Sequence, residues 1–141
     1  IAAHEAGHAL QDATNYGPLR LRSKMVPLCS IGNTLGYFVM VLGIILLYAS
    51  GGVGIGKTVV YVGAGLFSLV LLFQLVTLPV EFDATKRAKQ IVVDAGIIYP
   101  EERHGMDKVL GAAAMTYVAA LVTTLLTLAY YLMRVALASR D

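Results

Sequence analysis

Two histidines and a glutamate near the start of the chain form a pattern that can bind and use a metal ion. Residues 4–8 read H-E-A-G-H, which fits the zinc-protease pattern H-E-x-x-H. On a helix, residues four apart lie on one face, so His4 and His8 can each offer a ring nitrogen to one zinc ion. Glu5 is rotated off that face, where its carboxylate can take a proton from a metal-bound water. The spacing predicts two metal ligands and a general base.

The residues around this pattern favour a site over a chance match. Ala2, Ala3, Ala9 and Leu10, which flank it, are all small or apolar. Two imidazoles and a carboxylate are costly to bury in such surroundings without a partner. Gly7 lowers helix stability, which makes sense if another backbone must approach it closely. Coincidence or a degenerate site is the alternative.

Catalytic zinc usually has three protein ligands and a fourth position for water, so a third ligand must come from elsewhere. The candidates are Glu81, Asp83, Asp94, His104 and Asp12. On a helical wheel of about 100° per residue, Glu81 falls in an apolar arc, whereas Asp83 lies on a polar arc and pairs with Arg87. Zinc would compensate a buried carboxylate that has no cationic partner. We therefore expect Glu81 to be the third ligand, with Asp83 and His104 as alternatives.

Two supporting roles have several candidates. Gln11 or Asp12, about one turn after the second histidine, could orient its ring, or both could belong to a solvated helix end. A donor for the developing oxyanion is also expected. His104, Arg87 and Tyr99 are the available choices, although Arg87 already has a partner in Asp83.

The elements that must position these residues are membrane helices. The chain has 141 residues, of which 57% are hydrophobic and 14% are charged. Soluble domains usually contain about 25% charged residues, so this charged fraction is low. Three long stretches carry no charge, and each exceeds the roughly 20 residues that cross a bilayer. We predict an all-α integral membrane bundle with transmembrane helices near 31–50, 57–78 and 109–133, plus the H-E-x-x-H helix.

The chain divides into four expected segments: 1–30, the catalytic helix and a basic connector; 31–78, a transmembrane hairpin; 79–108, a polar segment with the third-ligand helix; and 109–141, the last transmembrane helix and tail. A glycine-rich turn at 51–56 joins the first two spans. Glycines 32, 36 and 43 permit close helix packing. Pro79 begins or kinks a helix, and Gly96 ends it.

The distribution of basic residues predicts the orientation in the membrane. Eight of the 11 Lys and Arg residues lie before the first span or between the second and third. By the positive-inside rule, the H-E-x-x-H helix and the segment 79–108 face the cytoplasm. Both polar segments then share one side of the membrane, as a composite metal site requires.

The chain resembles the YugP-type family of membrane-bound neutral zinc metallopeptidases. The matching blocks are A-H-E-A-G-H-A-L-Q-D-A at 3–13, L-P-V-E-F-D-A at 78–84, and K-V-L with A-A-A-M-T-Y-V-A-A within 108–120. The resemblance implies a membrane zinc protease with a poorly defined substrate, and a preceding part with another membrane helix.

A broader resemblance is to gluzincin membrane proteases. These carry Glu-x-x-x-Asp, in which the Asp supports a zinc-binding histidine. Glu81 fits the first position, but Thr85 replaces the Asp and leaves that support unassigned.

Other families match less well. Residues 4–9 also resemble FtsH-type proteases, and 51–58 fit the P-loop pattern, but uncharged spans flank that segment and no Walker B acid follows. Site-2-type intramembrane proteases add a Leu-Asp-Gly motif that is missing here. A membrane scaffold or regulator that keeps zinc without catalysis is the alternative outside the enzymes.

We therefore expect a membrane-embedded zinc-dependent endopeptidase in a bacterial cell membrane, crossing it several times. Zn²⁺ would be held by His4, His8 and Glu81, with Glu5 as the general base. Membrane proteins or peptides would be its substrates and the lipid bilayer its surroundings. A net charge of +2 is too small to argue for nucleic acid, and the single Cys29 excludes an internal disulfide.

Overall fold

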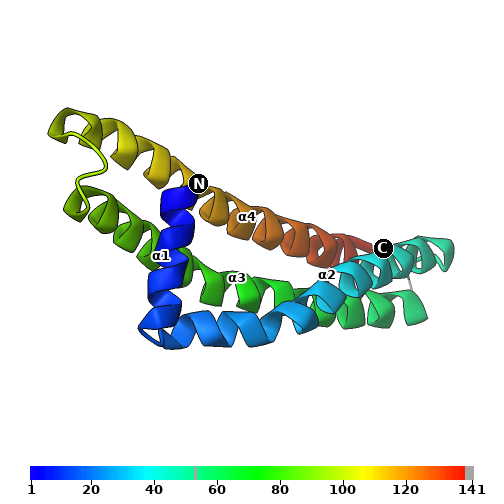
Figure 1. Cartoon of the computed structure of the whole chain (residues 1–141). Coiled ribbons are helices and arrows are strands. Elements are labelled where there is room, and N and C mark those ends of the chain that lie inside the picture. Colours follow the sequence, from blue (N-terminus) through cyan, green and yellow to red (C-terminus); the bar gives the residue numbers. More distant parts are fainter. Residues whose placement is uncertain (53, 139–141) are drawn as a thin grey trace. The chain divides into compact units, whose positions relative to one another are not determined.

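Every regular element in the described part of the chain is a helix. The computed structural model describes residues 1–52 and 54–138. Its elements, in chain order, are α1 (Ala2–Ala13), α2 (Gly17–Ala49), α3 (Ile55–Asp94), the short 3-10 helix η1 (Pro100–Glu102) and α4 (Arg103–Ala138) (Figure 1). The all-α fold expected from the sequence is confirmed.

Three of these helices are long and apolar enough to cross a membrane. Counting η1 with α4, they contain 33, 40 and 39 residues, and the most apolar part of each has a mean hydropathy of 1.9, 2.3 and 1.9. A bilayer core needs about 20 helical residues. Large apolar side chains such as Phe38, Ile45 and Leu126 stay exposed on these helices, as lipid-facing residues would. Three helices that could span a membrane are therefore present, as expected.

The helices extend further than the sequence analysis expected. The basic connector before Pro27 is helical and belongs to α2, and α3 continues through Pro79 without a new start. A proline inside a helix removes one backbone hydrogen bond, but long apolar helices tolerate it where neighbouring groups compensate. Glu81 consequently lies on the same helix as the second apolar stretch.

A residue in the left-handed backbone conformation follows the last turn of both α1 and α3. Asn15, with φ of 54°, follows α1, and Gly96, with φ of 63°, follows α3, as expected. At both ends, backbone N–H groups of the turn return to carbonyls of the last helical turn, which completes the helix hydrogen bonding. The expected turn at 51–56 is shorter, because α3 begins at Ile55. Val53 of this turn and residues 139–141 of the expected tail lie outside the described residues.

One compact unit, here called the metal-site unit, consists of Ile1–Ser23 and Gln74–Ala120. Within it, α1 crosses α3 (Figure 1). A β-carbon at Gly7 would lie 2.2 Å from the carbonyl oxygen of Ala84, so the two backbones are in contact. The buried apolar residues of this unit are Val80, Ala84, Ala88, Val92, Leu110 and Ala114.

A second compact unit, the apolar unit, consists of Lys24–Phe73 and Leu121–Asp141. Its α2 and α3 also approach closely at glycines: a β-carbon at Gly43 would lie 2.5 Å from the Val60 nitrogen, and one at Gly63 would lie 2.5 Å from the Met40 nitrogen. Small residues let membrane helices pack through their backbones. The core of this unit is formed by α2, α3 and α4 and contains Met40, Leu47, Val60, Ala64, Phe67, Tyr131 and Val135.

Candidate metal centre

The two histidines of the H-E-x-x-H pattern lie one turn apart on α1 and face the same way. Their ring centroids are 4.8 Å apart, and the ring planes are inclined at 86°. Both side chains are largely buried, with 13% of His4 and 18% of His8 exposed. Each ring directs its Nε2 toward α3, and so the pair is arranged to share one ligand-binding point.

Glu81 supplies the third group from α3. Its Oε2 lies 2.9 Å from His4 Nε2 and 3.3 Å from His8 Nε2. Glu81 is fully buried. The ligand atoms of these three side chains all lie within 4.8 Å of one another. The structure thus brings together the three residues that the sequence analysis named as metal ligands.

The spacing of these atoms fits a zinc ion. Two ligands bound about 2.0–2.1 Å from a tetrahedral zinc ion are themselves separated by roughly 3.4 Å. The two measured separations, 2.9 and 3.3 Å, are close to that value, so side-chain adjustments of a few tenths of an ångström would admit the ion. Two imidazoles and a carboxylate are also a ligand set of catalytic zinc sites.

Hydrogen bonds to Gln11 determine which nitrogen of His8 is free. Gln11 is fully buried, and its amide nitrogen donates to the Val80 carbonyl at 2.8 Å and to Asp83 Oδ2 at 2.9 Å. With both donors used, its Oε1 is left to accept from His8 Nδ1 at 2.9 Å. The proton on Nδ1 leaves the Nε2 lone pair directed at Glu81 Oε2. A metal cation between these two acceptors would satisfy both.

Asp83, the alternative third ligand, is committed to other partners. Its Oδ2 accepts from Gln11 and forms an ion pair with Arg87 Nε at 2.6 Å. Arg87 also donates to Thr14 Oγ1 at 3.0 Å, which links the end of α1 to α3. The surface pairing expected for Asp83 and Arg87 is present, and Asp83 contacts Gln11, which in turn binds His8.

Thr85 occupies the position at which gluzincins carry a supporting Asp. It is buried, and its Oγ1 lies 3.3 Å from His4 Nδ1. The hydroxyl oxygen can accept a hydrogen bond from a protonated Nδ1, which again leaves the Nε2 lone pair free to bind a metal. Gln11 and Thr85 therefore hold the two imidazoles in corresponding orientations.

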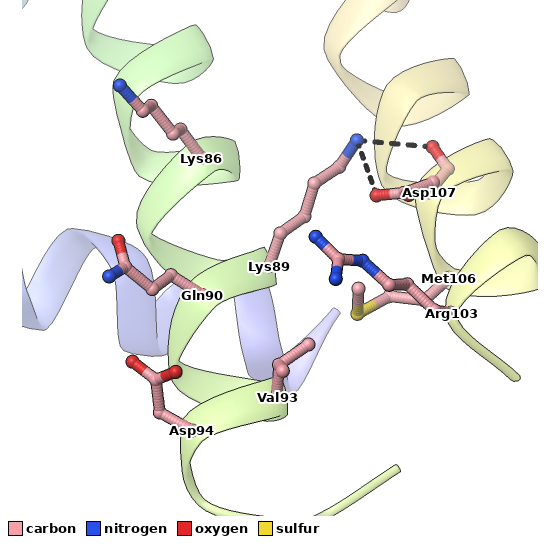
Figure 2. A pocket seen from close by; sticks show the side chains of 8 residues that line it. All are labelled: Lys86, Lys89, Gln90, Val93, Asp94, Arg103, Met106 and Asp107. Atoms are coloured by element: carbon pink, nitrogen blue, oxygen red, sulfur yellow. Dashed lines mark hydrogen bonds and ion pairs between the residues drawn. The ribbon is translucent and has the colours of Figure 1, made fainter. Parts of the chain in front are cut away.

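The remaining third-ligand candidates do not join this group. Asp12 and His104 are exposed. Asp94 lines a separate hollow of about 460 Å³ between α3 and α4, where Lys89 binds Asp107 at 3.1 Å (Figure 2). That hollow contains none of the three converging residues.

The expected general base and oxyanion donors can also be located. Glu5, adjacent to His4 in sequence, has an exposed side chain that solvent or a substrate can reach. Tyr99 is 74% exposed in the loop before η1, His104 is exposed, and Arg87 is paired with Asp83. None of these three is found among the residues around Glu81.

Two residues near Glu81 were missed by sequence reasoning. Arg22 of α2 places its Nη2 3.1 Å from Glu81 Oε1. Tyr117 of α4 is close enough to interact electrostatically with Glu81, Arg22 and Glu5. Neither belongs to a recognisable motif, and their approach depends on how α1, α2 and α4 turn toward α3. The only available signal for Arg22 was a cation at the start of an apolar helix.

Comparison with known proteins agrees with this geometry. Residues 1–136 match the model of a family described as "Putative neutral zinc metallopeptidase". The chain is 43% identical over 134 residues to a Bacillus subtilis (strain 168) protein named "Putative membrane protease YugP". The match covers 94% of this chain and 56% of that protein, so the chain spans about half of its relative's length. No solved structure matches the chain.

Proposed function

We propose that this chain, which belongs to the neutral zinc metallopeptidase family, hydrolyses peptide bonds as a membrane-embedded zinc-dependent endopeptidase. The observation that carries the proposal is the convergence of His4 Nε2, His8 Nε2 and Glu81 Oε2 on one point. These residues would hold a zinc ion, which would supply an activated water with a pKa near 7 and a Lewis acid for a substrate carbonyl.

In this proposal each residue of the site has a distinct role. His4, His8 and Glu81 hold the metal, and Gln11 and Thr85 fix the two imidazoles through their Nδ1 atoms. Glu5 is the general base: its carboxylate accepts the proton of the attacking water and delivers it to the leaving amine. Its exposed position next to His4 suits this exchange, since a base must reach both the water and the substrate.

The site would act at a membrane surface. The apolar lengths of α2, α3 and α4 and the name of the Bacillus relative support membrane association. The excess of Lys and Arg on one side of the expected spans supports a multi-pass protein with its metal centre facing the cytoplasm. Membrane proteins, or peptides at the membrane surface, are therefore the proposed substrates.

The deciding experiment compares the parent chain with Glu5→Gln, both purified in detergent. We expect the variant to retain one zinc ion per chain and to lose cleavage of a membrane-protein or casein substrate, because only the proton transfer is removed. A parent protein that binds zinc but cleaves nothing, with biological activity unchanged in Glu5→Gln, would instead favour a zinc-binding scaffold.

A further inference from the structure

The two oxygens of the Glu81 carboxylate face different partners. Oε2 is directed at the two imidazoles, whereas Oε1 lies 3.1 Å from Arg22 Nη2. Only 1% of the Glu81 side chain is exposed, so water cannot easily replace either partner. Oε1 is a buried oxygen without a geometrically satisfactory hydrogen bond among the described residues, and the Arg22 guanidinium is the cation beside it.

A carboxylate can bind a metal through one oxygen or through both. The choice affects chemistry, because a second carboxylate oxygen would fill the position that a catalytic zinc site keeps open for water. A guanidinium close to Oε1 attracts that oxygen away from the metal. In buried surroundings this attraction is stronger than in water.

Resting on the proposed zinc-peptidase function, we propose that Arg22 is a positioning residue that holds Glu81 as a single-oxygen ligand. Arg22 does so by drawing Oε1 away from the metal-binding point and by compensating the carboxylate charge. The fourth zinc position then remains available to water.

The local structure explains why Arg22, and not its neighbour Arg20, has this role. The left-handed Asn15 turns the chain between α1 and α2, and the first residues of α2, up to Ser23, belong to the same compact unit as the metal ligands. Residues two apart on a helix differ by about 200° in direction. Arg20 consequently points elsewhere: it is exposed and pairs with Asn15. Arg20 is thus a matched control with the same side chain.

The test measures metal binding and coordination in the full chain, purified in detergent. Zinc affinity is measured by competition with a chromophoric chelator for the parent, Arg22→Gln and Arg20→Gln. We expect Arg22→Gln to bind zinc about 10–100-fold more weakly, as for other groups that orient a ligand, and Arg20→Gln to match the parent. Cobalt(II) substituted for zinc should change its visible spectrum from four- to five-coordinate in Arg22→Gln alone.

Two further variants separate this role from a general effect on folding. Arg22→Lys keeps the positive charge, so it should fold and retain more affinity than Arg22→Gln, although it lacks the forked donor geometry. In a Glu81→Ala background, Arg22→Gln should change cobalt affinity less than about twofold. The carboxylate through which Arg22 would affect the metal is absent from that background.

Two results would overturn the proposal in distinguishable ways. If the parent binds zinc but Arg22→Gln has the parental zinc affinity and cobalt spectrum, Arg22 does not position Glu81 and the zinc site stands. If the parent binds no zinc at all, both the proposed function and this inference are wrong.

Discussion

His8 Nδ1 lies 2.9 Å from Gln11 Oε1, and this hydrogen bond sets the orientation of the imidazole because both amide donors of Gln11 are already used. The remaining nitrogen of the ring is directed at Glu81. A fully buried amide with three satisfied hydrogen bonds leaves little freedom for a flipped ring.

Replacing Gln11 should therefore weaken metal binding while leaving all three metal ligands in place. In Gln11→Met the new side chain can neither accept from His8 Nδ1 nor donate to Val80 and Asp83. We expect zinc affinity to fall about 10–100-fold, measured by chelator competition. Asp12→Asn, at the next position but exposed, is the control and should bind zinc like the parent. Equal affinities in both variants would contradict the role of Gln11.

The identity of the third ligand can be tested by metal analysis of two neighbouring variants. Glu81→Ala removes the atom that faces both imidazoles, so only the two histidines remain as ligands; we expect its zinc affinity to fall far below that of the parent and the purified variant to carry little zinc. Asp83→Ala removes a partner of Gln11 and Arg87, so it should keep zinc with reduced affinity. If only Asp83→Ala empties the site, Glu81 is not the ligand.

Gly7→Ala tests the close contact between α1 and α3. Its β-carbon would lie 2.2 Å from the Ala84 carbonyl oxygen, so the helices must separate. We expect a destabilisation of about 1–3 kcal/mol, with weaker zinc binding, because separation moves the histidines away from Glu81. Gly111→Ala is the control: its β-carbon would meet nothing within 4 Å, and it should raise stability by about 0.5–1 kcal/mol. Thermal unfolding in detergent measures both.

The apolar unit offers a similar pair of substitutions. A β-carbon at Gly63 would lie 2.5 Å from the Met40 nitrogen, whereas one at Gly65 would meet nothing within 4 Å. Gly63→Ala should lower the unfolding temperature in detergent because it forces α2 and α3 apart within this unit, and Gly65→Ala should not. If the two variants unfold at the same temperature, the glycine contact does not contribute to stability.

The predicted membrane orientation can be tested with single cysteines in a Cys29→Ala background. A membrane-impermeant thiol reagent should label Glu101→Cys only when the cytoplasmic face is accessible, as in inside-out vesicles. Lys57→Cys should show the opposite pattern. Both positions are exposed, so access to the reagent depends on the membrane side and not on burial. Labelling of the two from the same side would refute the topology.

The length of the uncharged stretches was sufficient to predict the three long helices, and periodicity was sufficient to predict the burial of Glu81. The wheel placed Glu81 among apolar residues and Asp83 with Arg87, and the structure has a fully buried Glu81 and an Asp83–Arg87 ion pair. These features depend on one helix at a time, which a sequence describes well. Gly7 could also be interpreted in advance, since a glycine within a helix suggests a close neighbour.

The surroundings of the centre could not be predicted in the same way. Arg22, Thr85 and Tyr117 approach His4 or Glu81 from three different helices, and their positions depend on turn geometry and helix crossing. Pro79 suggested a helix start or a kink because proline removes a backbone donor, whereas the fold shows that α3 continues through it. Because position 85 is not an Asp, the sequence did not show which residue supports His4. In the structure the Thr85 hydroxyl lies beside His4 Nδ1.

No side chain fits between Gly7 and Ala84, which limits how α1 can pack on α3. A shift of α1 by one residue, with the accompanying 100° turn, would place the side chain of Ala6 or His8 against the same carbonyl. The imidazoles are consequently held level with Glu81 by the backbone itself, before any ion arrives. A metal ion would then meet ligands that are already in place, with no refolding of the protein around it.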